Sequence, residues 1–141
     1  YYLGGYNNNP PIANEMYGYE RGTLRYNTYR PLYWDGMVGL MYPSDYGYAA
    51  GNSCVSGTKL VDYDEECMNK DWFYISNTSQ WLMTPYSGGS DYVLIIFLTG
   101  KVNDSIKSSY SVGAVRPVFY LKSSTSITGG TGTSTDPYIL S

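Results

Sequence analysis

The sequence contains no histidine and few charged residues: charged side chains make up 15% of the 141 positions, and the formal net charge is −3. Without imidazole groups, the chain has neither a Ser-His-Asp or Cys-His catalytic arrangement nor a histidine metal site. The acidic balance argues against nucleic acid as a partner, because a phosphate backbone requires a basic surface. The longest apolar run, Val93 to Leu98, is far shorter than the ~20 residues of a membrane-spanning helix, so we expect no direct membrane insertion of this segment.

Tyrosine dominates what the sequence does contain, with 18 Tyr against 3 Trp and 3 Phe. Tyrosine supplies a large amphipathic contact area at a low cost in rotamer entropy. A weakly charged chain that is rich in Tyr, Ser, Gly and Asn therefore favours an extracellular protein with a recognition surface.

The only two cysteines, Cys54 and Cys67, lie 13 positions apart in polar sequence. One disulfide between them is the simplest interpretation and implies an oxidising compartment, while two free thiols in a cytosolic protein are the alternative. The chain begins without an initiator Met or a signal peptide. We therefore expect residues 1–141 to be a C-terminal fragment of a longer exported protein.

The hydrophobic pattern predicts the α+β class, with short strands, long loops and one or two short helices. A helical turn capped by Ser44 and Asp45 is expected to run through Ala50, followed by a long polar loop over residues 51–70. Gly100 is expected to turn the chain after a strand. Strands are expected at residues 24–29, 34–42, 81–85, 92–99, 112–121 and 137–140.

Four stretches form a recognisable combination: VGLMYPSDYGYA at 38–49, WLMTPYS at 81–87, VRPVFYL at 115–121 and GGTGTSTDPY at 129–138. Together they resemble the C-terminal domains of pilin-like surface proteins from gut Firmicutes. The Trp-x-x-Thr-Pro and Val-Arg-Pro frame is similar to the C-type-lectin-like fold. That fold also occurs in formylglycine-generating enzymes and in the variable proteins of diversity-generating retroelements. The resemblance implies a single C-type-lectin-like domain over residues 1–141.

The resemblance also implies roles for particular residues. Trp81 and the segment 115–121 are expected in the fold core. Arg116 is expected to be structural, with its guanidinium satisfying carbonyls or a carboxylate near the sheet; an exposed strand arginine is the alternative. The formylglycine-generating branch needs reactive cysteines near its C-terminus, and no cysteine follows Cys67. We therefore expect no enzymatic activity, no catalytic residue and no cofactor.

In the retroelement branch, the diversified residues lie between the strand of the Trp motif and the Arg-Pro strand, which corresponds to residues 86–113. Diversification acts on adenines, mostly in Asn-type codons, which cannot become Glu, Gln, Trp or Met codons. The window contains none of these four residue types. The resemblance thus predicts a diversified binding surface here, with an ordinary loop-rich hairpin as the alternative.

Alternation along the strand at 92–99 predicts that Ile96 points into the core and that Ile95 and Phe97 point outward. An exposed apolar patch on a monomer marks a binding surface. A strand buried on both faces is the alternative, since it also reads as a continuous apolar run. The predicted ligand contacts are Tyr86, Asp91, Ile95, Phe97, Asn103, Asp104, Ile106 and Tyr110.

The only acidic cluster runs from Asp62 to Glu66. Oxygen ligands at close spacing can hold Ca²⁺, but this stretch lacks the glycine and the spacing of a calcium loop. The cluster therefore favours a solvated loop, and no metal site is predicted.

These observations predict a non-enzymatic, extracellular or cell-surface ligand-binding domain. The expected partner is a protein on a host, bacterial or phage surface rather than a carbohydrate. The reason is that the sequence shows no group of residues typical of a calcium or carbohydrate site. The alternative function is a structural subunit of a pilus or cell-surface assembly that uses the Ile95/Phe97 patch for subunit packing.

Overall fold

The computed structural model describes residues 9–21, 35–69, 73–86, 92–107, 113–133 and 135–141. The described residues combine helices with small antiparallel sheets, which confirms the mixed α+β class. The strand expected at 24–29 lies outside them. No helix among the described residues is long and apolar enough to cross a membrane.

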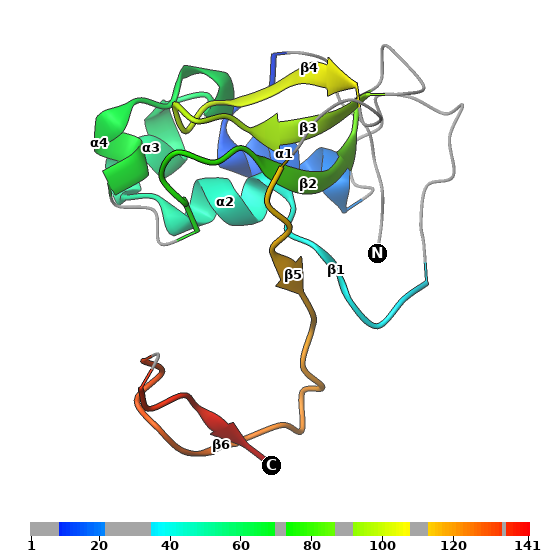
Figure 1. Cartoon of the computed structure of the whole chain (residues 1–141), viewed down its shortest axis with the longest axis vertical. Helices are drawn as coiled ribbons and strands as arrows, with labels where there is room; N and C mark the ends of the chain where they lie inside the picture. The colour runs from blue at the N-terminus through cyan, green and yellow to red at the C-terminus, as the bar shows by residue number, and fades with distance from the viewer. Residues whose placement is uncertain (1–8, 22–34, 70–72, 87–91, 108–112, 134) are drawn as a thin grey trace.

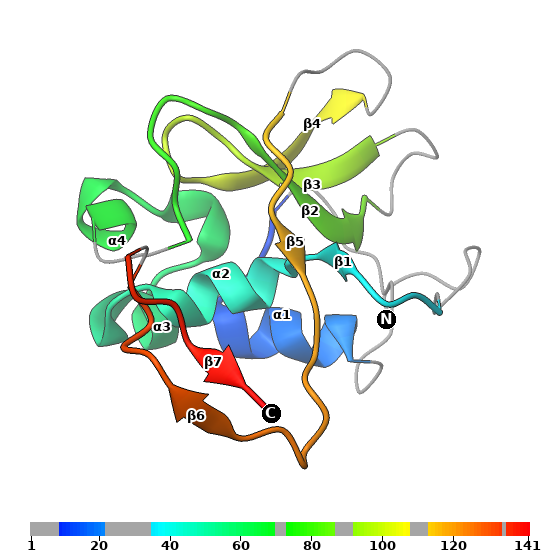
Figure 2. The same cartoon turned by 60° about the horizontal axis from the view of Figure 1, so that its bottom comes forward.

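Helices α1 (Ala13–Glu20) and α2 (Pro43–Ala49) lie side by side, as Figure 2 shows. Their close approach depends on small residues: a Cβ atom added to Gly47 would come within 2.7 Å of the Ala13 Cβ atom and of the Leu60 side chain. Proline at the first position suits the start of α2, since that position needs no N–H donor. The Asp45 carboxylate accepts a hydrogen bond of 3.0 Å from the Tyr42 N–H and closes the first turn. The helical turn expected in this region is confirmed, but its N-cap residue is Tyr42, and Ser44 lies within the helix.

The segment predicted to be a long polar loop is helical instead. It contains α3 (Asn52–Gly57), the short 3₁₀ helix η1 (Leu60–Asp62) and α4 (Glu65–Asn69). The expectation of one or two short helices is therefore wrong for the described residues. Helices of five or six residues are unstable alone in water. Here the fully buried side chains of Leu60 and Tyr63 fix them, together with the disulfide between Cys54 and Cys67. The predicted cysteine pairing is confirmed.

Three antiparallel strands form the main sheet in the order β2 (Gln80–Pro85), β3 (Tyr92–Ile96) and β4 (Val102–Lys107). The strands expected at 81–85 and 92–99 are confirmed, although β3 ends at Ile96. Gly100 turns the chain between β3 and β4, as predicted, with a positive φ of 77°. A side chain at this position would also collide with Met68, since an added Cβ atom would lie 2.0 Å from its Cγ atom.

The core lies between the helices and this sheet (Figure 1). Met16 of α1, Tyr46 of α2 and Leu94 of β3 are fully buried in it. The two central tyrosines also satisfy their polar ends. The Tyr46 hydroxyl donates to the Gly100 carbonyl at 2.9 Å, and the Tyr63 hydroxyl donates to the Gly47 carbonyl at 3.1 Å. Buried tyrosines of this kind stabilise the fold and are unavailable for recognition.

The chain after the sheet pairs back onto the start of the helical layer. β5 (Pro117–Val118) is antiparallel to β1 (Gly39–Leu40) and forms a separate two-stranded sheet. Only these two-residue strands replace the long strands that were expected at 34–42 and 112–121. Proline at 117 cannot donate to a ladder, which limits strand pairing there.

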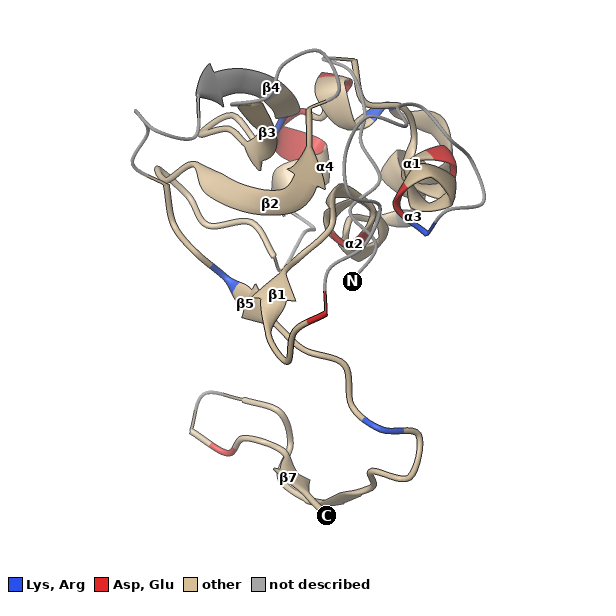
Figure 3. Ribbon diagram, turned by 90° about the vertical axis from the view of Figure 1, so that its right-hand side faces the viewer, with Lys and Arg blue, Asp and Glu red and all other residues tan. Residues whose placement is uncertain are grey.

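The last part of the chain forms the C-terminal hairpin, residues 126–141. Its strands are β6 (Ile127–Gly129) and β7 (Ile139–Leu140), and Figures 1 and 3 show it apart from the helices and the main sheet. The Ser126 and Ser141 backbones exchange two hydrogen bonds of 3.1 Å at its open end. The expected strand at 137–140 is thus confirmed at its last two residues.

Candidate functional site

A groove of about 540 Å³ lies between α2, the segment before β2 and the residues that follow β5. We call it the aromatic groove. Its lining residues are Asp45, Tyr48, Ala49, Phe73, Val118, Phe119 and Tyr120.

Helical spacing explains the first wall of the aromatic groove. Asp45, Tyr48 and Ala49 are three and four residues apart in α2, so they share one helix face. The opposite wall comes from the end of β5, where Phe119 and Tyr120 remain 61% and 62% exposed. Tyr48 is 46% exposed. Large aromatic side chains thus face solvent from both walls.

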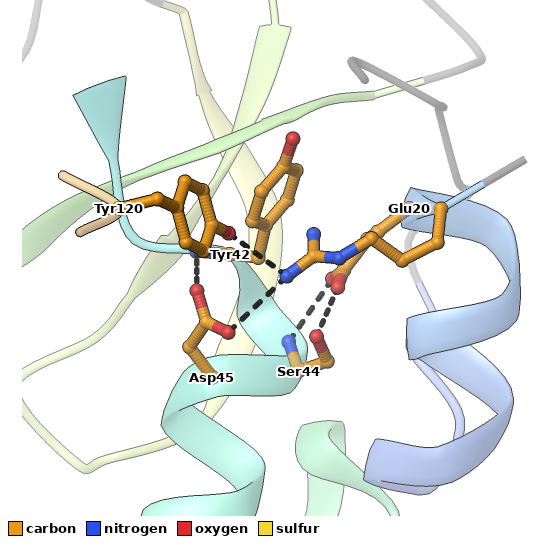
Figure 4. A network of polar contacts seen from close by, with 6 residues as sticks. Glu20, Tyr42, Ser44, Asp45 and Tyr120 are labelled. Carbon is orange, nitrogen blue, oxygen red and sulfur yellow. Dashed lines mark hydrogen bonds and ion pairs between the residues drawn. The ribbon is translucent and has the colours of Figure 1, made fainter. Parts of the chain in front are cut away.

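One end of the aromatic groove carries a polar network (Figure 4). The Arg21 guanidinium, just after α1, lies 4.0 Å from the centre of the Tyr42 ring. Its Nη2 atom donates to the Tyr120 hydroxyl at 3.0 Å and lies 3.5 Å from Oδ1 of Asp45. Arg21 therefore links α1, α2 and the chain after β5 at a single point.

Glu20 lies behind this network and is fully buried. Its Oε1 atom accepts a 3.0 Å hydrogen bond from the Ser44 N–H, and its Oε2 atom is hydrogen-bonded to the Ser44 hydroxyl. Burial raises the pKa of Glu20 from 4.5 to about 8; the nearby Asp45 acts in the same direction, and the Ser44 bonds and Arg21 oppose it. Glu20 is accordingly protonated at neutral pH. Its side chain is inaccessible to solvent and does not line the groove.

The charges at the groove compensate each other. Asp45 faces Arg21, and both carboxylate oxygens of Asp45 accept hydrogen bonds within the protein. Among the described residues, no group of three or more His, Cys, Asp or Glu side chains is placed to hold a metal ion. The aromatic groove therefore presents aromatic rings to a ligand. Its described lining residues carry no uncompensated charge that would attract an ionic ligand.

The predicted contacts in the window 86–113 are only partly described. Tyr86 is half-buried, and its ring packs edge-on against Tyr92 at 5.8 Å. Phe97 and Asn103 are also half-buried. Asp91 and Tyr110 lie outside the described residues, as do the side chains of Asp104 and Ile106.

The expectation that Ile95 points to solvent is wrong, since its side chain is only 2% exposed. Leu94 and Ile96 are fully buried in the core on the other face of β3, so this strand is covered on both sides. Ile95 pairs with Trp81 across the sheet, and cross-strand partners share a face. The exposed Ile95/Phe97 patch does not exist, and the alternative of a doubly buried strand is correct.

Trp81 shares this second face with Ile95, and the chain at Ala114 pairs with the start of β2. Trp81 is half-buried, and a Cβ atom on Gly113 would come within 2.7 Å of its indole nitrogen. The backbone N–H of Trp81 also donates to the Ala114 carbonyl at 3.0 Å. The Arg116 guanidinium lies 5.9 Å from the centre of the Phe73 ring. The structural roles predicted for both residues remain predictions. The expectation that the segment 115–121 lies in the fold core is wrong, because Val115, Phe119 and Tyr120 are more than 60% exposed.

Sequence reasoning missed the aromatic groove and the Glu20–Arg21 pair behind it. The signal that could have located the groove was present, because both walls fall within the motif stretches 38–49 and 115–121. Phe73, the remaining lining residue, lies outside the motif stretches.

Comparison with known proteins gives no matching family, no similar curated protein and no similar solved structure. The function must therefore be inferred from the residues of this chain.

Proposed function

We propose that the chain is a non-catalytic, extracellular ligand-binding domain whose aromatic groove holds an apolar segment of a protein partner. The observation that carries this proposal is the exposure of Tyr48, Phe119 and Tyr120 around one cavity of about 540 Å³. Concave apolar sites with a few oriented polar groups are the usual ligand sites of proteins. Aromatic side chains are also the residues most enriched at the centres of protein interfaces.

A protein segment suits the groove better than a carbohydrate does. A sugar presents many hydroxyl groups and needs several free hydrogen-bonding partners. Here the polar atoms are already engaged: the Tyr48 hydroxyl donates to Asn14, and the Tyr120 hydroxyl and Asp45 both face Arg21. What remains available is mostly aromatic and aliphatic surface.

The Cys54–Cys67 disulfide supports an oxidising, extracellular location. Placement at the cell surface, a C-type-lectin-like fold and diversification of residues 86–113 belong to the same proposal. Their support is the resemblance of the motif stretches to surface proteins.

The test is a selection of displayed random peptides against the intact chain, followed by binding measurements on two variants. Phe119→Ser removes an exposed aromatic side chain from the groove. Leu98→Ser is the matched control, because Leu98 is 53% exposed but lies outside the groove, within the window 86–113. Selected apolar peptides are expected to bind wild type and Leu98→Ser equally and Phe119→Ser about tenfold more weakly. Loss of binding in Leu98→Ser alone would move the site to the predicted window.

A structural role in an assembly is the second candidate, and one observation favours it. Thirteen large apolar side chains are strongly exposed among the described residues, and eight of them fall in the last 27 positions. The eight are Val115, Phe119, Tyr120, Leu121, Ile127, Tyr138, Ile139 and Leu140. So much exposed apolar surface in one segment marks an interaction surface.

A further inference from the structure

Among the described residues, the C-terminal hairpin forms a two-stranded sheet that joins no other sheet. Ile127 and Ile139 are each 60% exposed, and Tyr138 and Leu140 are also exposed. The described residues give this hairpin two strands and no third neighbour. Two strands without a covering layer are marginally stable in water. The hairpin therefore presents apolar side chains that a contact would stabilise.

The loop of the hairpin nevertheless has a defined shape. Gly130 and Gly132 adopt positive φ angles of 81° and 79°. The Asp136 carboxylate and carbonyl both accept from the Thr131 N–H, at 3.0 and 3.1 Å. At Gly132 an added Cβ atom would lie 2.5 Å from the Tyr138 ring, so the loop packs tightly on that side chain. A preorganised element of this kind loses little entropy when it docks.

The hairpin and the aromatic groove are compatible in charge. Asp136 is the only charged residue of the hairpin, and its carboxylate is occupied by the Thr131 N–H. Figure 3 shows the hairpin as almost entirely uncharged. The groove offers Asp45 already paired with Arg21. Asp136 lies in the exposed loop of the hairpin, so contact through the strand side chains would leave its carboxylate in solvent.

The apolar areas are large enough for a dimer if two copies exchange hairpins. Ile127 and Leu140 are cross-strand partners on one face of the hairpin, whereas Ile139 points to the opposite face. Each copy would contribute Ile127, Tyr138 and Leu140 of the hairpin and the groove aromatics Tyr48, Phe119 and Tyr120, all roughly half exposed. At roughly 100 Å² each, these six side chains supply about 600 Å² per copy, at the lower end of the roughly 600 to 1,000 Å² per partner of a stable interface. If the hairpin of only one copy docked, the contact would bury about half of that area.

We propose that the C-terminal hairpin of one copy docks in the aromatic groove of a second copy, and that the exchange is reciprocal. This inference rests on the proposed function, because it names a partner for the same groove. Within one copy the chain is held at the groove edge by the β1–β5 pairing and by the bond from Arg21 to Tyr120. Beyond this point the hairpin lies apart from the helices and the main sheet (Figure 1). Reciprocal exchange gives a closed two-fold dimer.

The experiment measures the mass of the full chain in solution by light scattering, from low to several hundred micromolar. Wild type is expected to reach twice the monomer mass of 15.8 kDa. Leu140→Asp, in the hairpin, and Phe119→Ser, in the groove, are each expected to stay monomeric over the range in which wild type dimerises. Ile127→Asp, the cross-strand partner of Leu140, provides a second hairpin variant on the same face, and Leu98→Ser is the control that still dimerises. Circular dichroism verifies that each variant is folded.

Mixing the two monomeric variants is the most discriminating part of the experiment. Leu140→Asp retains an intact groove and Phe119→Ser retains an intact hairpin, so the mixture is expected to form a weaker heterodimer with one docked hairpin. A wild type that stays monomeric throughout, variants that dimerise as wild type does, or a mixture that stays monomeric would each overturn the proposal. If wild type is monomeric while selected peptides still bind the groove, the exchange is wrong and the ligand-binding function stands. If no peptide binds either, both are wrong.

Discussion

We call the described residues up to Tyr120 the body of the molecule. In the body, Tyr46 and Tyr63 are fully buried, and their hydroxyls donate to backbone carbonyls. In the C-terminal hairpin, Tyr138 and Ile139 are more than half exposed, and the loop is shaped by glycines and by Asp136. The body thus obtains its stability from a core of its own. The hairpin obtains its shape locally and leaves its apolar side chains for a partner. Changes in the body should therefore affect unfolding, and changes in the hairpin should affect association.

The largest expected effect is a pH dependence that comes from Glu20. Its pKa is 4.5 in the unfolded chain and about 8 in the folded one, because burial penalises the charged carboxylate. This contribution to stability is complete below pH 4.5 and is lost as pH rises through about 8, by about 5 kcal/mol at most. Urea unfolding between pH 4.5 and 9 should show the decline in wild type.

Glu20→Gln isolates this effect, because the amide resembles the protonated acid and cannot ionise. We expect the variant to gain stability relative to wild type as pH rises. Glu15→Gln is the matched control, since Glu15 is exposed on the same helix. A pH profile of Glu20→Gln that runs parallel to that of wild type would show that Glu20 is not the titrating group.

The next effect compares one leucine in each region. Leu94→Ala empties a fully buried site in the core and should lower the free energy of unfolding by about 3 to 4 kcal/mol. Leu140→Ala in the hairpin removes a side chain that is already 42% exposed, and should change that free energy by less than about 0.5 kcal/mol. Both values come from denaturant titration at a protein concentration low enough to keep the chain monomeric. Equal effects would contradict the division into a self-stabilised body and an unpartnered hairpin.

The Cys54–Cys67 bond should contribute about 3 kcal/mol, because it closes a loop of 13 positions in the unfolded chain. The double variant Cys54→Ser/Cys67→Ser is expected to unfold at correspondingly lower denaturant, with the disulfide-bonded wild type as reference. Hydrogen exchange should rise first in α3 and α4, which the bond joins. Unchanged exchange in these two helices would show that the buried Leu60 and Tyr63 are sufficient to hold them.

Local signals predicted several parts of the fold. The two strands β2 and β3, the turn at Gly100 and the helical turn at α2 follow from residue type and spacing within a few positions. The pairing of two cysteines in polar sequence was likewise predictable. Each of these features depends on interactions close in sequence or on a single possible partner.

The remaining features depend on contacts that no local pattern contains. Residues 51–70 carry too few apolar side chains to predict helices, yet Leu60 and Tyr63 dock into the core and stabilise them. Alternation correctly placed Ile95 opposite Ile96, but it could not reveal that the second face is also covered, which leaves Ile95 only 2% exposed. The aromatic groove unites side chains from positions 45 to 120, so only the folded chain defines it.

Calorimetric titration of a selected apolar peptide into wild type, Phe119→Ser and Leu98→Ser tests the central claim most directly. Exposed aromatic side chains around one groove should account for the binding, so Phe119→Ser should bind about tenfold more weakly while Leu98→Ser matches wild type. Equal affinity of all three proteins for the peptide would contradict the assignment of the aromatic groove as the ligand site.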